Sequence, residues 1–106
     1  MSRNKYHNRK TGGFDSVREK GRYAELLLLQ RAGKIQGLER QVRFELLPAQ
    51  YENHKCVFRG VSYVADFTYW ENGKFVVEDV KGVKTDVYRL KAKMMFYFHH
   101  ILIRET

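Results

Sequence analysis

Residues 64–81 read VADFTYWENGKFVVEDVK, in which Asn72-Gly73 separates two runs rich in β-branched and aromatic residues. An Asn-Gly pair between such runs predicts a β-hairpin closed by a two-residue type I′ turn. A turn of this length fixes the register, and it places Asp66 directly opposite Asp79. Opposed side chains have Cβ atoms roughly 4.5–5.5 Å apart, and like charges there are destabilising. The hairpin therefore predicts two carboxylates held face to face.

A lysine follows on the same face of the second strand. Strand side chains alternate between faces, so Lys81 shares the face of Asp79, whereas Glu78 points the other way, opposite Phe67. Two opposed carboxylates beside a lysine are not expected to stabilise the fold, because like charges repel. Hard oxygen ligands suit Mg²⁺ or Mn²⁺, and a lysine can neutralise charge that develops on a phosphoryl group. The pattern predicts a divalent-metal site that cuts phosphodiesters.

Composition sets the class of protein and of partner. The chain has 106 residues, 43% of them hydrophobic and 14% aromatic, which is typical of one folded domain. A formal net charge of +8 favours a polyanionic partner, with nucleic acid first. One cysteine excludes an intramolecular disulfide, and no signal peptide or long apolar run is visible. We expect a cytoplasmic protein, in the host cytoplasm if phage-encoded, with no membrane partner.

The chain divides into a short basic segment and one domain. Residues 1–13 carry four basic side chains and no acid, which predicts a flexible arm that orders on a phosphate backbone. Arg9 and Lys10 would then contact nucleic acid. An ordinary solvated terminus explains the same composition equally well. Residues 14–106 are expected to form the single folded domain.

A first helix is expected over residues 16–32. Ser16 followed three residues later by Glu19 is a capping-box pattern, and Gly33 is typical of the residue that follows a helix. The apolar stripe of this helix is expected to comprise Val17, Ala24, Leu27 and Leu28.

The remaining elements follow from periodicity and turn residues. Thr85 or Asp86 can cap a second helix. A helix before the last strand predicts a crossover and hence a parallel pair. The order is therefore αβββαβ, an α/β (α+β) fold with a mixed sheet. The expected strands are 42–46, 61–70, 74–80 and 101–103, with a long turn at 49–60, and the apolar face of the second helix is expected to comprise Val87, Leu90, Met94 and Phe98.

With this order in place, the chain resembles the PD-(D/E)xK nuclease superfamily. The matching residues are Asp66 in the second strand, after Val64-Ala65, and the triplet Asp79-Val80-Lys81 at the end of the third. Ala65 stands where that motif often has proline. More narrowly, Phe14-Asp15-Ser16, Ala65-Asp66-Phe67 and residues 77–82 look like short phage-encoded proteins assigned to this superfamily. The resemblance implies a restriction-endonuclease-like core, a mixed four-stranded sheet flanked by helices.

The resemblance also implies roles for individual residues. Asp66, Asp79 and Lys81 would be catalytic, and the two aspartates would hold Mg²⁺ or Mn²⁺ with the backbone carbonyl of Val80. Glu19 would join them as a catalytic residue and ligand. The capping box alone explains Glu19 as well, at about 1 kcal/mol, and Glu25 is a weaker alternative. The implied products carry 5′-phosphate and 3′-hydroxyl ends.

Basic residues near this site have two interpretations. Lys84 follows the third strand, and Lys91 and Lys93 lie on the second helix, so all three can contact nucleic acid. Lys91 and Lys93 can equally form the solvated face of an amphipathic helix. The pairs His99-His100 and His54 with Cys56 lack the ligand spacing of a structural zinc site.

The expected function is therefore a Mg²⁺-dependent endodeoxyribonuclease without an organic cofactor. A phage Holliday-junction or branched-DNA resolvase, or a nickase, fits the same residues. Symmetric incision needs two active sites, which predicts a homodimer. The alternative is a non-catalytic basic module that binds nucleic acid through charge and through aromatics such as Tyr63, Tyr69 and Trp70. Metal-dependent cleavage separates the two.

Overall fold

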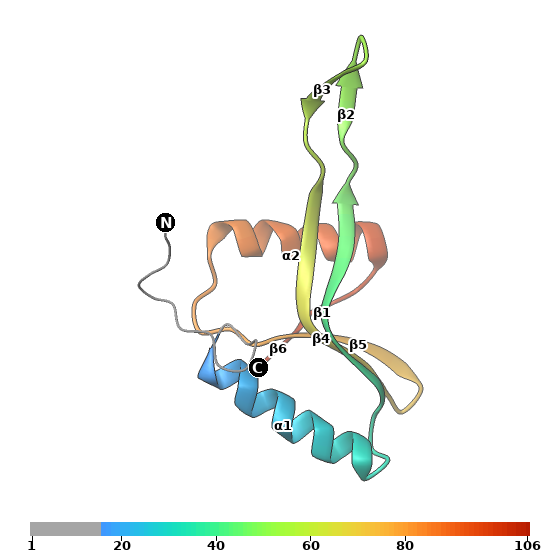
Figure 1. Cartoon of the computed structure of the whole chain (residues 1–106), viewed down its shortest axis with the longest axis vertical. Helices are drawn as coiled ribbons and strands as arrows, with labels where there is room; N and C mark the ends of the chain where they lie inside the picture. Colours follow the sequence, from blue (N-terminus) through green and yellow to red (C-terminus); the bar gives the residue numbers. More distant parts are fainter. Residues whose placement is uncertain (1–15) are drawn as a thin grey trace.

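The computed structural model describes residues 16–106, so the predicted basic arm, with Arg9 and Lys10, lies outside the described residues. The elements, drawn in Figure 1, are α1 (Val17–Arg31), β1 (Gln36–Leu47), β2 (Gln50–Glu52), β3 (Lys55–Phe58), β4 (Val61–Glu71), β5 (Lys74–Asp79), α2 (Asp86–His99) and β6 (Arg104–Glu105). None of the helices in this part of the chain is long and apolar enough to cross a membrane.

Four strands form the main sheet, in the order β1-β4-β5-β6. β1, β4 and β5 pair antiparallel, and β6 pairs parallel to β5 after the α2 crossover. The expected α+β class with a mixed four-stranded sheet is confirmed. The last strand was predicted over residues 101–103, which is wrong, because only 104–105 reach β5.

The central hairpin has the predicted turn and register. Asn72 and Gly73 have φ angles of 53° and 76°, as a type I′ turn requires. Phe67 pairs with Glu78, the last pair of the β4–β5 ladder. Asp66 and Asp79 come one step beyond this pair, where the two strands part.

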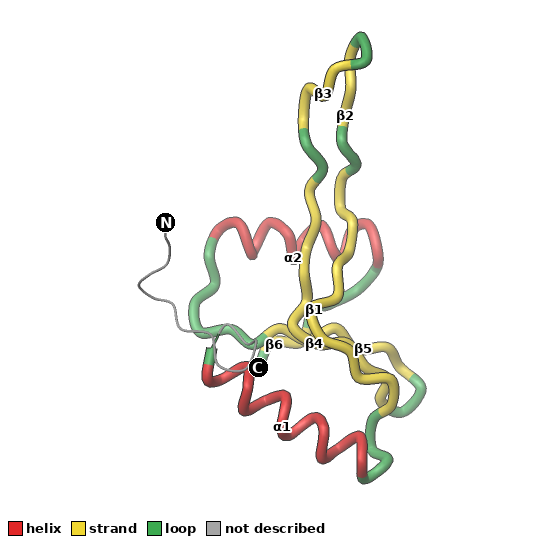
Figure 2. Tube along the Cα trace, viewed as in Figure 1, coloured by secondary structure: helices red, strands yellow, loops and turns green. Residues whose placement is uncertain are grey.

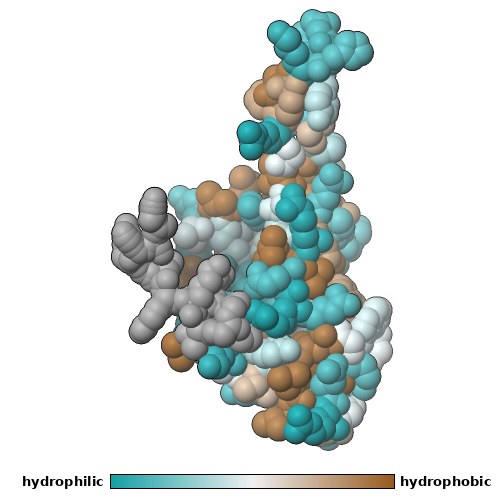
Figure 3. All heavy atoms as spheres, viewed as in Figure 1, coloured by the Kyte–Doolittle hydropathy of each residue, from teal (hydrophilic) through white to brown (hydrophobic). Residues whose placement is uncertain are grey.

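The segment predicted as a long turn is instead a second hairpin. β2 and β3 pair antiparallel, and Asn53 and His54 at their turn have positive φ angles. The two strands form an arm that extends away from the sheet (Figure 2). Apolar side chains lie below its hydrophilic tip (Figure 3), and on this arm Val57 is 50% exposed and Phe58 is 63% exposed. The prediction failed because the turn residues Asn53 and His54 lack the glycine that makes Asn72-Gly73 a strong hairpin signal.

The predicted starts of both helices are confirmed at their caps, as is the end of α1 before Gly33, and Thr85 is the residue that caps α2. The side chain of Ser16 accepts a hydrogen bond from the backbone N–H of Glu19, and Thr85 accepts one from Tyr88. Gly33, after α1, has a φ of +79°. Each cap satisfies a backbone donor that the first turn leaves without a partner.

The predicted buried faces of the helices are wrong. In α1, Leu26 is fully buried, whereas Val17 and Leu28 are exposed. In α2, the buried residues are Tyr88 and Met95, and three of the four predicted core residues are exposed, namely Val87, Leu90 and Phe98. Apolar residues surround α2 on most sides, so its periodicity does not select one face.

Two apolar clusters form the core, one against each helix. Leu26 of α1 packs with Phe67 and Val76, and Met95 of α2 packs with Tyr63 and Val77. α1 and α2 thus cover different parts of the sheet and lie on either side of β5 in Figure 1. Asp66, in the middle of β4, and Asp79, at the end of β5, come where the pairing of these two strands stops.

Candidate functional site

A pocket of about 440 Å³ opens where β4 and β5 part, beside the first half of α2. Asp66, Asp79 and Lys81 all line it, so the structure brings the three residues of the predicted centre together. The remaining lining comes from β1, the start of β4 and the first turns of α2, as Gln41, Ser62, Tyr63, Val64, Thr85, Val87, Tyr88 and Lys91.

Asp66 lies in an environment that disfavours its charge. Burial raises the pKa of Asp66 to about 7, and the neighbouring Asp79 and the charge of Glu19 act in the same direction. One contact opposes them, because the backbone N–H of Val80 donates to Asp66 Oδ2 over 2.8 Å. Near neutral pH the Asp66 carboxyl group is therefore stabilised by a bound proton or by a nearby cation.

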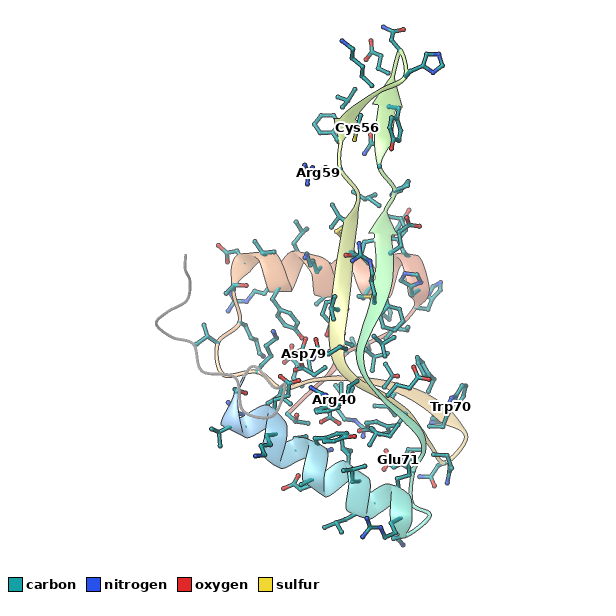
Figure 4. All side chains as sticks on the ribbon, viewed as in Figure 1. Arg40, Cys56, Arg59, Trp70, Glu71 and Asp79 are labelled. Atoms are coloured by element: carbon teal, nitrogen blue, oxygen red, sulfur yellow. The ribbon has the colours of Figure 1, made fainter. Side chains whose placement is uncertain are left out.

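Asp79 is almost fully buried but has two partners. The Tyr63 hydroxyl donates to Asp79 Oδ2, and Lys81 Nζ lies 3.4 Å from Oδ1. Burial and this carboxylate raise the pKa of Tyr63 above its usual value, so Tyr63 remains a neutral donor. These contacts fix the orientation of the carboxylate, whose position is labelled in Figure 4.

Lys81 is held by α2 and by the C-terminal strand. Its Nζ lies 4.2 Å from the centroid of the Tyr88 ring, a cation–π distance. The Tyr88 hydroxyl donates to Glu105 Oε2 over 2.8 Å, and the Lys81 backbone N–H donates to the Thr106 carbonyl over 3.0 Å. β6 thus supports the ammonium group in the pocket.

Glu78 points away from the pocket, as the strand alternation predicts. Its carboxylate is fully buried under α1. Arg22 donates to it through Nε over 2.6 Å and through a second nitrogen over 3.1 Å, and the hydroxyls of Tyr69 and Thr106 also donate to it. A carboxylate with this many donors belongs to the packing of α1, which leaves Asp79 as the acid of the pocket.

Glu19 forms the expected cap and also approaches the site. Its backbone N–H donates to Ser16, while its carboxylate, on a residue 3% exposed, accepts a hydrogen bond from Gln41 Nε2 over 2.9 Å. Glu25, the alternative, is exposed and pairs with Arg22 at 3.0 Å. Within residues 16–106, no three Asp, Glu, His or Cys side chains form a metal-binding group.

One comparison with known proteins places the chain in a family. A family model described as a protein of unknown function (DUF1064) matches residues 3–105. The chain belongs to the DUF1064 family. No curated protein and no solved structure matches it. For this DUF1064 chain the resemblance to PD-(D/E)xK nucleases, the metal, the DNA and the homodimer all stay predictions.

The predicted basic residues of the DUF1064 chain lie in different places. Lys91 lines the pocket. Lys84 Nζ pairs with Glu105 Oε1 at 2.8 Å, and Lys93 is exposed on α2 outside the lining. Lys91 is therefore the one of these three that the structure brings to the carboxylates.

The sequence alone did not assign Gln41 or Tyr63 to the pocket, and it did not predict the contact of the Tyr88 ring with Lys81. Gln41 could have been found from register alone. Arg40 pairs with Phe67 and Val42 with Ala65, so Gln41 falls opposite Asp66. A prediction that began β1 before residue 42 would have placed it there.

Proposed function

We propose that this chain is a divalent-metal-dependent endonuclease that hydrolyses DNA at the Asp66–Asp79 pocket. One observation carries the proposal: two carboxylates from adjacent strands line the same open pocket with a lysine 3.4 Å from one of them. A net charge of +8 fits a polyanionic substrate. The same charges fit RNA, which the experiment below includes.

The donor set fits Mg²⁺ or Mn²⁺. Mg²⁺ is commonly bound by one or two carboxylates, with waters and substrate phosphate oxygens as the remaining ligands. Asp66 and Asp79 supply the carboxylates, and burial, with smaller contributions from Asp79 and Glu19, raises the pKa of Asp66, so a nearby cation would stabilise its charged form. Glu19 and the carbonyl of Val80 are the further oxygens that we propose as ligands. A bound divalent ion would supply charge stabilisation for the phosphoryl group and a more acidic water.

The side chains of the pocket perform the remaining tasks. In hydrolysis, water attacks phosphorus, the bond from phosphorus to the 3′ oxygen breaks, and that oxygen takes a proton. Lys81, held between Asp79 and the Tyr88 ring, would orient the attacking water and neutralise developing negative charge. Lys91, which lines the same pocket, would bind a phosphate of the substrate. Tyr63 keeps the Asp79 carboxylate in place.

The proposal predicts metal-dependent cutting. Purified protein is incubated with labelled four-way junction, linear duplex, single-stranded DNA and single-stranded RNA, in Mg²⁺, in Mn²⁺ and in EDTA. We expect cleavage of DNA in either metal and none in EDTA. Symmetric cuts confined to the junction would identify a resolvase acting as a homodimer.

The same experiment distinguishes the nuclease from a non-catalytic module that only binds nucleic acid. A non-catalytic binding module would retain the nucleic acid on a gel, would lose affinity steeply with salt, and would leave every strand intact in both metals. That result would contradict the nuclease. Cleavage of RNA alone would change the substrate and leave the catalytic residues as proposed.

A further inference from the structure

Gln41 has a backbone conformation that strands rarely contain. Five residues other than glycine in the described part of the chain have positive φ, and four of them lie in turns or at a helix cap. Gln41, with a φ of 53°, lies inside β1. For a residue with a Cβ this left-handed region costs free energy, and such residues cluster at functional sites.

An inserted residue does not explain this conformation. Arg40 and Val42 pair with Phe67 and Ala65 in one continuous register, so no bulge falls at Gln41. In Figure 4, Arg40 lies where the long β1–β4 ribbon meets the rest of the sheet. The strained residue therefore sits beside Asp66, at the point where the pocket begins.

The side chain of Gln41 lines the pocket and holds one nearby acid, Glu19. Gln41 lines the pocket with Asp66 and Asp79, and its Nε2 donates to Glu19 Oε2 over 2.9 Å. Glu19 is 3% exposed, and its charge contributes to the raised pKa of Asp66. A buried carboxylate needs hydrogen-bond donors, and Gln41 supplies one from the neighbouring strand.

We propose that Gln41 is a positioning residue, held in a strained backbone conformation so that its carboxamide fixes Glu19 beside the Asp66–Asp79 pair. This role rests on the proposed metal-dependent nuclease. Partners behind a metal ligand set its orientation, and their loss commonly weakens metal affinity 10–100-fold. Gln41 would act through Glu19 and would not itself touch the reacting atoms.

The strain is tested by comparing Gln41→Gly with Gln41→Ala. Both variants lack the carboxamide, so their difference reports the backbone alone. Glycine adopts positive φ without a Cβ penalty, and we expect Gln41→Gly to melt about 4 °C or more above Gln41→Ala. Arg43, an exposed residue of β1 without positive φ, is the matched control. At position 43 the alanine variant should melt above the glycine variant, because glycine weakens an ordinary strand.

The positioning role is tested by Mn²⁺ affinity, measured by calorimetry on the folded variants. We expect Gln41→Ala and Gln41→Gly to lose Mn²⁺ affinity by a similar factor, roughly tenfold. In a Glu19→Gln background, the same substitutions should have little further effect, because the residue through which Gln41 acts has lost its charge. Cleavage of DNA should fall in parallel.

Three outcomes show which part of the proposal fails: the role of Gln41, its action through Glu19, or the metal site itself. Wild-type Mn²⁺ affinity in both Gln41 variants, with affinity lost in Glu19→Gln, would overturn the role of Gln41 and leave the metal site intact. A full additional loss from Gln41 substitution in the Glu19→Gln background would overturn the route through Glu19. A wild-type protein that binds no Mn²⁺ would overturn the proposed function and this role with it.

Discussion

Replacing Asp79 by asparagine is expected to slow metal-dependent cleavage by up to about 10³-fold while the fold survives. The substitution removes one of two carboxylates from the pocket but keeps an oxygen that can accept from Tyr63. Loss of one electrostatic contact to a charged transition state costs roughly 10²–10³-fold, and a metal ligand should lie at the upper end. The fold should melt within about 4 °C of the wild type, because a like-charge pair is lost together with one ion pair.

The measurement is single-turnover cleavage of labelled DNA in saturating Mg²⁺, beside a thermal melt of each protein. Glu78→Gln is the matched control, because it also replaces a carboxylate by a carboxamide. Glu78 directly precedes Asp79 in β5, and its side chain points away from the pocket. It should retain most of the cleavage at a temperature where it is folded. Equal cleavage by Asp79→Asn and the wild type would contradict the assignment of Asp79.

Replacing Glu78 by glutamine is expected to lower the stability of the fold strongly, whereas Asp79→Asn affects mainly cleavage. Glu78 is fully buried, and its ion pair with Arg22, whose side chain is 24% exposed, closes at 2.6 Å. Removing one partner of a buried ion pair leaves the other charge without compensation and costs about 3 kcal/mol or more. For a domain of this size that corresponds to a fall in Tm of roughly 10 °C or more.

Glu25→Gln is the control for this second prediction, because Glu25 pairs with the same arginine at 3.0 Å from an exposed position, 67% accessible. Surface pairs of this kind contribute at most about 1 kcal/mol, so its Tm should change little. Chemical denaturation of the three proteins gives the free energies of unfolding directly. A Glu78→Gln variant as stable as Glu25→Gln would show that Glu78 does not hold α1 to the sheet.

Local chemistry made the centre of the fold predictable. The Asn72-Gly73 turn fixes a register by itself, so the approach of Asp66 and Asp79 followed from the sequence alone. Strand alternation then separated Asp79 from Glu78. Both signals act within 16 residues of chain and do not depend on how the rest of the molecule packs.

The features that were missed depend on contacts between distant segments. The face of α2 that is buried is decided by Tyr88, whose hydroxyl reaches Glu105 and whose ring meets Lys81. Nearly every side of α2 is apolar, so periodicity could not choose that face. The left-handed conformation of Gln41 has no local sequence signal, because glutamine does not favour positive φ.

The most direct test of the central claim is anomalous scattering from crystals grown with Mn²⁺. We expect a peak bound by the carboxylates of Asp66 and Asp79, in the pocket beside Lys81. A well-ordered pocket with no peak at this pair, or Mn²⁺ found only at another acidic residue, would contradict the metal-dependent nuclease.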